Sequence, residues 1–263
     1  MVDSQCSKSY TVEDLRNIVA LLRSPQGCPW DREQTHRSIR RNFLEEAYET
    51  CEAIDTGDRT LLCEELGDVL LQVIFHARIE EEAGYFNLDD VADASCKKLI
   101  SRHPHIFGDT TAENADAVML AWDEIKRREK QHTSITQAME AVAKSLPATW
   151  RAEKIQDKAK KVGFDWPDVQ GALDKLREET DELRDAIAQQ SGMEEEVGDL
   201  LFSVVNVARM LGVDPEDALH QTSNKFIRRF DYLEQRAKQQ GRDLRDMSLD
   251  EMEALYQEGK SEL

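Results

Sequence analysis

Proline and glycine are scarce in this chain of 263 residues. It contains 12 glycines and 6 prolines, and no proline falls between Pro29 and Pro104 or between Pro167 and Pro215. Because proline is the strongest helix breaker, its absence leaves long stretches that are free to form helices. These stretches are rich in Glu, Leu, Ala, Arg and Lys. The scarcity therefore predicts an all-α protein.

Cysteines are few and hydrophobic runs are short. The 5 cysteines have no C-x-x-C spacing, which argues against a disulfide framework and fits a reducing compartment. Charged residues stand at positions 3, 8, 13, 14 and 16, so the first residues do not resemble a signal peptide. The longest apolar runs, such as residues 69–71 and 200–202, are far too short to span a membrane. We therefore expect a cytoplasmic protein with no membrane segment.

Basic residues are outnumbered by acidic ones. The chain has 34 Lys and Arg against 53 Asp and Glu, which gives a formal net charge of −19. Such a surface argues against nucleic-acid binding through neutralised phosphates. A small anionic substrate is still compatible with it, if bound metal and a few local bases reverse the field in a cleft.

An acidic pattern occurs twice in the chain. In each copy an E-x-x-E pair is followed by an E-x-x-D pair, with residues 50–64 between the pairs in the first half and residues 183–195 in the second. Spacing of i and i+3 places each pair on one face of a helix, where like charges repel. A hard divalent cation such as Mg²⁺, bound by these carboxylates, would offset their repulsion. The candidate metal ligands are Glu179, Glu182, Glu196 and Asp199, with a second possible site at Glu46, Glu49, Glu65 and Asp68.

The two halves match beyond their acidic residues. With short gaps, the matched features are Ala53-Ile54 and Ala186-Ile187, Asp68-x9-Arg78 and Asp199-x9-Arg209, Lys98-x3-Arg102 and Lys225-x3-Arg229, and Trp30 and Trp166. A match over about seventy residues indicates an internal duplication. We therefore predict two tandem helical-bundle domains, residues 1–135 and residues 136–263. We interpret the two tryptophans as packing residues, with base stacking as the alternative.

Each copy is predicted to contain an antiparallel helical hairpin. The turns are expected at residues 56–58 and 190–192. In the first hairpin, Glu49 and Glu65 are equally far from the turn, so they are expected to lie at the same level along the hairpin axis. The first helix carries an apolar stripe, Leu44, Ala47, Cys51 and Ile54. Residues 196–208 of the second hairpin are apolar apart from one polar stripe. We expect this helix to be buried on most sides and to contribute to an oligomer interface.

The acidic pattern also suggests a chemistry. Carboxylates that hold Mg²⁺, or Mn²⁺ as the alternative, leave coordination positions that suit a polyphosphate. Lys225 and Arg229, one helical turn apart, are candidates for binding its oxygens. A metal-bound water would be the nucleophile. Glu178 and Glu195 each adjoin a predicted ligand, and we expect them to orient this water or to accept its proton.

These motifs resemble the MazG family of nucleoside triphosphate pyrophosphohydrolases. The likeness rests on E-x-x-E and E-x-x-D, and on residues 28–31, 103–105 and 163–166, so it covers nearly the whole chain. It implies an all-α fold related to the dimeric dUTPases, and a homodimer. It also implies Mg²⁺-dependent hydrolysis of (d)NTPs to NMP and pyrophosphate, with a role in nucleotide-pool control or house-cleaning.

The resemblance also assigns residues and domains. It implies that the C-terminal domain is the main catalytic one, and that the N-terminal domain has a weaker or regulatory role with Lys98 and Arg102 as counterpart residues. The nucleotide contacts that it implies are Lys175, Glu178, Glu195, Lys225, Arg229, Tyr256 and Lys260.

Two alternatives to an enzyme follow from the same acidic faces. One is a nucleotide sensor that binds with metal but does not hydrolyse. The other is an acidic helical module that binds a basic partner, is indifferent to Mg²⁺ and tolerates Glu179→Gln. Only the enzyme would form product with metal and lose this activity in that variant.

Overall fold

The computed structural model describes residues 9–108 and 134–262, together with residues 111, 114, 118, 122 and 125. Within these ranges every regular element is a helix and no strand occurs, so the predicted all-α fold is confirmed. No helix in this part of the chain combines the length and the apolar character that a membrane crossing requires. Four cysteines, at positions 28, 51, 63 and 96, have free thiols.

The chain divides into two compact units, residues 1–129 and residues 130–263. Residues 126–133, next to the predicted domain boundary at 135, lie outside the described residues. The exact boundary therefore stays a prediction.

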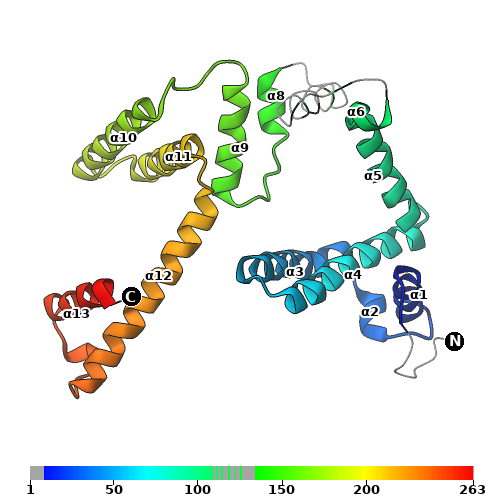
Figure 1. Cartoon of the computed structure of the whole chain (residues 1–263), viewed down its shortest axis with the longest axis horizontal. Coiled ribbons are helices and arrows are strands. Elements are labelled where there is room, and N and C mark those ends of the chain that lie inside the picture. The colour runs from blue at the N-terminus through cyan, green and yellow to red at the C-terminus, as the bar shows by residue number, and fades with distance from the viewer. Residues whose placement is uncertain are drawn as a thin grey trace. The chain divides into compact units, whose positions relative to one another are not determined.

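A long antiparallel hairpin forms the centre of the first unit (Figure 1). Its helices are α3 (His36–Thr56) and α4 (Arg59–Ala83). The turn between them lies where the sequence predicts it. Gly57 takes the left-handed conformation with φ 69°, and the Asp58 side chain accepts hydrogen bonds from the first backbone N–H groups of α4. The remaining helices are α1 (Val12–Leu22), α2 (Pro29–Glu33), α5 (Leu88–Arg102) and α6 (Pro104–Phe107).

The core of the first unit lies between α1, α3 and α4. Its buried members are Val19, Ile39, Ile74 and Phe75. The stripe predicted to be the apolar face of α3 does not form this core.

Leu44 is 39% exposed and Ile54 is 58% exposed. The helix instead buries Ile39 and Ala53. The i, i+3, i+4 periodicity of α3 is compatible with more than one face, and α1 and α4 pack on the face that carries Ile39. The apolar stripe of α3 is therefore not the face that packs within the described part of the first unit.

The second unit repeats the hairpin. Helix α10 (Val169–Gln189) is joined to α11 (Met193–Leu211) by residues 190–192, as predicted. Gln190 and Gly192 both have positive φ, 55° and 75°, which reverses the chain direction within a short turn. The other helices are α8 (Ile135–Glu140), α9 (Ala148–Lys160), α12 (Pro215–Gln239), the short 3₁₀ helix η1 (Leu244–Asp246) and α13 (Leu249–Glu262).

Helix α13 packs against the C-terminal part of α12, as Figure 1 shows. Leu233, Ala237, Met247 and Leu255 are buried between these elements and form the main apolar cluster of the second unit.

Helix α11 is less buried than its composition predicts. Val197, Leu201, Phe202 and Val204 are 43–61% exposed, and only Ser203 and Val205 are buried. Helices α9 and α10 pack against α11, and no element within the described part of the second unit covers its remaining apolar side. Within the described part of its own unit, α11 is therefore not buried on most sides. The oligomer interface that was predicted with it stays a prediction.

Candidate active site

The second hairpin gathers three of its four predicted acids. Glu179 of α10 and Glu196 and Asp199 of α11 place carboxylate oxygens within 4.8 Å of one another. Glu179 is only 5% exposed, so its charge is largely removed from water. Three carboxylates at this distance repel one another unless a cation lies between them, and for the buried Glu179 the charged form is also costly to desolvate. The donor set consists of carboxylate oxygens alone, which is the chemistry that Mg²⁺ prefers.

Glu182, the fourth predicted ligand, lies one turn further along α10 at its surface. A hydrogen bond with Glu179, and then partial burial, raises the pKa of Glu182. Glu182 is therefore a neighbour of the three gathered carboxylates.

Lys175 supplies the local positive charge. Its Nζ lies 2.7 Å from Glu178 Oε1 and 2.8 Å from Glu179 Oε1. These hydrogen bonds, to Glu178 first, raise the pKa of Lys175, which is charged at any physiological pH. One helical turn thus combines a base, an exposed acid and a buried acid.

The two predicted catalytic acids are carried by different helices. Glu178 is exposed on α10 and bonded to Lys175. Glu195 is exposed in the first turn of α11, where the helix dipole stabilises negative charge. Both side chains are exposed, so each is accessible for exchanging a proton with water.

The remaining predicted nucleotide contacts form a second group, on α12 and α13. The Tyr256 ring lies 5.6 Å from that of Phe226, which follows Lys225 in the chain, and Lys260 Nζ lies 5.7 Å from the Tyr256 centroid. Arg229 is one turn further along α12. This group lies on different helices from the acids of α10 and α11. The structure thus arranges the predicted site residues as two groups.

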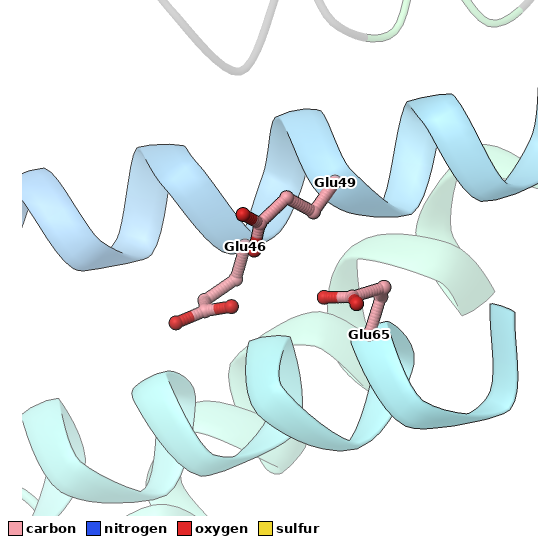
Figure 2. A group of neighbouring side chains, drawn as sticks. All are labelled: Glu46, Glu49 and Glu65. Carbon is pink, nitrogen blue, oxygen red and sulfur yellow. The ribbon is translucent and has the colours of Figure 1, made fainter. Parts of the chain in front are cut away.

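The first unit has its own acidic cluster. Figure 2 shows Glu46 and Glu49 on α3, and Glu65 on α4, with their carboxylates in the space between the two helices. Their oxygens lie within 4.8 Å of one another. Burial first, and then the charges of neighbouring acids that include Asp68, raises the pKa of both Glu46 and Glu65.

The basic counterparts of the first unit lie on α5. Lys98 is exposed there, and the Arg102 guanidinium carbon lies 5.1 Å from the centroid of the Trp122 ring. These bases are therefore carried by a different helix from those that carry the acidic cluster.

Sequence reasoning missed one buried ion pair, which involves the last turn of α11. Arg209 Nη2 lies 2.5 Å from Asp165 Oδ1 and 2.7 Å from Asn206 Oδ1. In the sequence, Arg209 stood out only because it aligns with Arg78, and that alignment did not predict an ion pair.

Comparison with known proteins identifies the family. A model of the MazG nucleotide pyrophosphohydrolase domain matches residues 34–107 and 168–233, which contain both hairpins and both acidic clusters. The chain belongs to the MazG family. The predicted family, its enzymatic class and the tandem arrangement of two similar helical domains are thereby confirmed.

MazG relatives match along nearly the whole chain. The nucleoside triphosphate pyrophosphohydrolase/pyrophosphatase MazG of Thermotoga maritima is 42% identical over 248 residues, which cover 94% of this chain and 95% of that protein. The nucleoside triphosphate pyrophosphohydrolase of Escherichia coli (strain K12) is 42% identical over 254 residues, which cover 95% of this chain and 97% of that protein. The alignments thus span nearly the whole length of this chain and of both relatives.

Proposed function

We propose that this protein hydrolyses ribo- and deoxyribonucleoside triphosphates between the α- and β-phosphates, giving a nucleoside monophosphate and pyrophosphate. The observation that carries the proposal is the cluster of Glu179, Glu196 and Asp199, with Lys175 beside it. Carboxylates that hold a cation, together with a base in the next turn, suit a polyphosphate. Such an activity would serve nucleotide-pool control or house-cleaning. The four free thiols support a reducing cytoplasm as its location.

Mg²⁺ is the cation that this site fits, and Mn²⁺ is the alternative. Glu179, Glu196 and Asp199 would hold it, with Glu182 as a further ligand at the surface. When bound, the ion would neutralise phosphate charge and lower the pKa of a coordinated water.

The residues of the chain have distinct roles in this proposal. Lys175 would exchange its bond to Glu179 for phosphate oxygens once a cation neutralises that carboxylate. Glu178 and Glu195, exposed at the edge of the cluster, would orient the attacking water and accept its proton. Further phosphate and nucleoside contacts would come from the second group, Lys225, Arg229, Tyr256 and Lys260.

We further propose that the protein is a homodimer. The exposed apolar side of α11 includes Val197, Leu201 and Val204, and the next helix, α12, exposes Phe226 and Ile227. Apolar surface on this scale is normally covered by a partner. Leu201→Lys is expected to yield a monomer, as measured by light scattering during size-exclusion chromatography.

The first unit is proposed to bind a cation and to act weakly or as a regulator. The alignment that sets Glu46 against Glu179 also sets Asn42 against Lys175. The first cluster therefore lacks the base that the second has within its helix.

Product analysis with each canonical nucleoside triphosphate, with and without Mg²⁺, tests the proposal. We expect NMP and pyrophosphate only with metal, and loss of both in Glu179→Gln. Release of NDP and orthophosphate would contradict the site of attack. Metal-dependent binding without product would favour the sensor, and indifference to Mg²⁺ would favour the interaction module.

A further inference from the structure

Two histidines of the first unit face each other across its hairpin. His36 is the first residue of α3, His76 lies in the C-terminal half of α4, and their Nδ1 atoms are 2.7 Å apart. The ring planes differ by 8° and the ring centroids are 5.0 Å apart. This centroid separation is close to the largest that a 2.7 Å contact between two ring nitrogens permits. The rings therefore lie edge to edge, and each Nδ1 points at the other.

Glu80 orients the His36 ring from the opposite side. Nε2 of His36 donates to Oε1 of Glu80 over 2.5 Å. Because a carboxylate oxygen is the acceptor, a neutral His36 ring carries its proton on Nε2 and has a free lone pair on Nδ1. In the neutral pair, His76 Nδ1 donates the proton between the two rings to that lone pair. The chain from Glu80 through His36 to His76 thus aims two imidazole nitrogens at one point, with a carboxylate behind the first ring.

The hairpin itself does not require these polar residues. In the alignment of the acidic pairs, the counterparts of His36, His76 and Glu80 in the second unit are Val169, Val207 and Leu211, in that order. The same pair of antiparallel helices thus forms with three apolar residues at these positions. Helix packing alone therefore does not explain why the first unit places two imidazoles and a carboxylate here.

The histidine pair is separate from the acidic cluster of its own unit. His36 precedes Glu46 in α3, and His76 follows Glu65 in α4. At about 1.5 Å per residue, each histidine lies roughly 15 Å along its helix from the acid. The ligand chemistry also differs, because Mg²⁺ takes oxygen ligands whereas imidazole suits ions such as Zn²⁺ and Ni²⁺. An ion held by the two rings would therefore belong to another class from one held by the carboxylates.

We propose that His36 and His76 bind a divalent transition-metal ion such as Zn²⁺ through their two Nδ1 atoms. A histidine that ligates a metal usually donates its other ring N–H to a carboxylate, which fixes the tautomer and raises the basicity of the ligand. Glu80 occupies this position at His36. The proton between the rings would move to Nε2 of His76, so that this ring stays neutral.

The rings need to move only slightly to hold such an ion. Two Zn–N bonds of about 2.0–2.1 Å at a tetrahedral angle place the nitrogens roughly 3.3 Å apart, which is about half an ångström more than their present separation. The His36 side chain is 44% exposed, which allows this movement and gives water access to the remaining coordination positions. The bound ion would tie the first turn of α3 to α4 and would stabilise the folded first unit.

The ring signals of the histidines test the site directly. The ¹⁵N-labelled full chain, in excess Mg²⁺ as a competitor for carboxylate sites, is titrated with Zn²⁺ while the ring ¹⁵N resonances of its 6 histidines are recorded. We expect saturable shifts at His36 and His76 alone. His103 and His105 are the internal control, because their rings are tilted by 52° and Nδ1 of His103 contacts the Leu99 carbonyl oxygen at 2.7 Å. Zn²⁺ bound by thiols does not affect this readout, since only histidine rings are observed.

Three variants use residues that the second unit already carries. His36→Val and His76→Val are therefore expected to fold, and each should abolish the Zn²⁺-dependent shift of the remaining histidine. Glu80→Leu should weaken Zn²⁺ binding about 10- to 100-fold, the usual effect of losing a carboxylate that supports a metal ligand. In excess Mg²⁺, Zn²⁺ should also raise the urea midpoint of the wild type more than that of His36→Val.

A titration without a shift at His36 and His76 would overturn the proposal, and so would shifts confined to His103 or His105. A His76 shift that persists in His36→Val would also overturn it, and equal Zn²⁺ affinity in Glu80→Leu would exclude the role of the carboxylate. The wild-type titration decides the question even if a variant does not fold, because each ring gives its own signals. None of these measurements depends on hydrolysis, so the result stands apart from the proposed function.

Discussion

Replacing Lys175 with methionine should destabilise the metal-free protein. Glu179 would lose the ammonium group that neutralises it, and the Glu179 side chain is 7% exposed. Breaking a buried ion pair typically costs about 3–5 kcal/mol, because one charge stays buried without a partner. The Lys175 side chain is 36% exposed, so solvent screens part of this loss. We expect the free energy of unfolding to fall by roughly 1–2 kcal/mol, between the buried and surface limits.

Mg²⁺ should reverse this loss, because a bound cation takes over the neutralisation of Glu179. A ligand that binds only the folded state at about 100 times its Kd adds about 2.7 kcal/mol. Without the competing ammonium group, Lys175→Met should bind Mg²⁺ about 5- to 30-fold more tightly than the wild type, which corresponds to the same roughly 1–2 kcal/mol. Its KM for a nucleoside triphosphate should nevertheless rise, since a phosphate contact is gone.

Urea unfolding at pH 7.5, with and without Mg²⁺, measures both effects. Arg177→Met is the matched control, since Arg177 pairs with Asp174 on the same helix and their side chains are 68% and 60% exposed. We expect the control to change the free energy of unfolding by less than about 0.5 kcal/mol in either condition. If Lys175→Met lowers the free energy of unfolding equally with and without Mg²⁺, the reasoning is refuted. It is also refuted if the variant loses no stability in the absence of Mg²⁺.

Three further predictions concern other parts of the fold. Burial and neighbouring acids raise the pKa of Glu65, so the folded state loses stability as pH rises through that pKa. Glu65→Gln should therefore raise the metal-free urea midpoint at pH 7.5 but not at pH 4, and a lower midpoint at pH 7.5 would contradict this. Burial and the charge of His36 lower the pKa of His76, so stability is lost as pH falls below about 6.5, the usual value for His. His76→Gln should flatten the fall in urea midpoint between pH 7 and pH 5; an unchanged slope would exclude this role. Leu233→Ala should cost about 2–5 kcal/mol in urea unfolding, because Leu233 is 3% exposed, whereas Leu249→Ala, at a 75% exposed site, should cost little. Equal losses would show that α13 does not pack on α12 in solution.

The sequence predicted the local features of the fold well. Gly57 and the spacing of the acids located the first turn, because a left-handed residue and an antiparallel register are both local properties. The gathering of Glu49 with Glu65 followed from the same register. In the second hairpin that register sets Glu182 opposite Glu196, whereas the structure brings Glu179 to Glu196.

Features that depend on distant residues or on other molecules could not be predicted. The exposed side of α11 has the composition of a buried helix, and a sequence does not state whether its own chain or a second one covers it. The link between Arg209 and Asp165 joins residues 44 positions apart. The contact between Tyr256 and Phe226 depends on how α13 folds back on α12. None of these contacts has a periodic signal.

The two hairpins divide their acids differently. The first cluster takes two carboxylates from α3 and one from α4, whereas the second takes one from α10 and two from α11. The acid pairs are alike in the two copies, but the spacer formed by residues 183–195 is shorter than the one formed by residues 50–64. After a gene segment has been duplicated, a small insertion or deletion in the turn of one copy can thus change which of its acids come together. The codons of the acids themselves stay unchanged. Divergence of this kind needs no change at the site itself, and it offers a route by which one ancestral hairpin could supply two specialised ones.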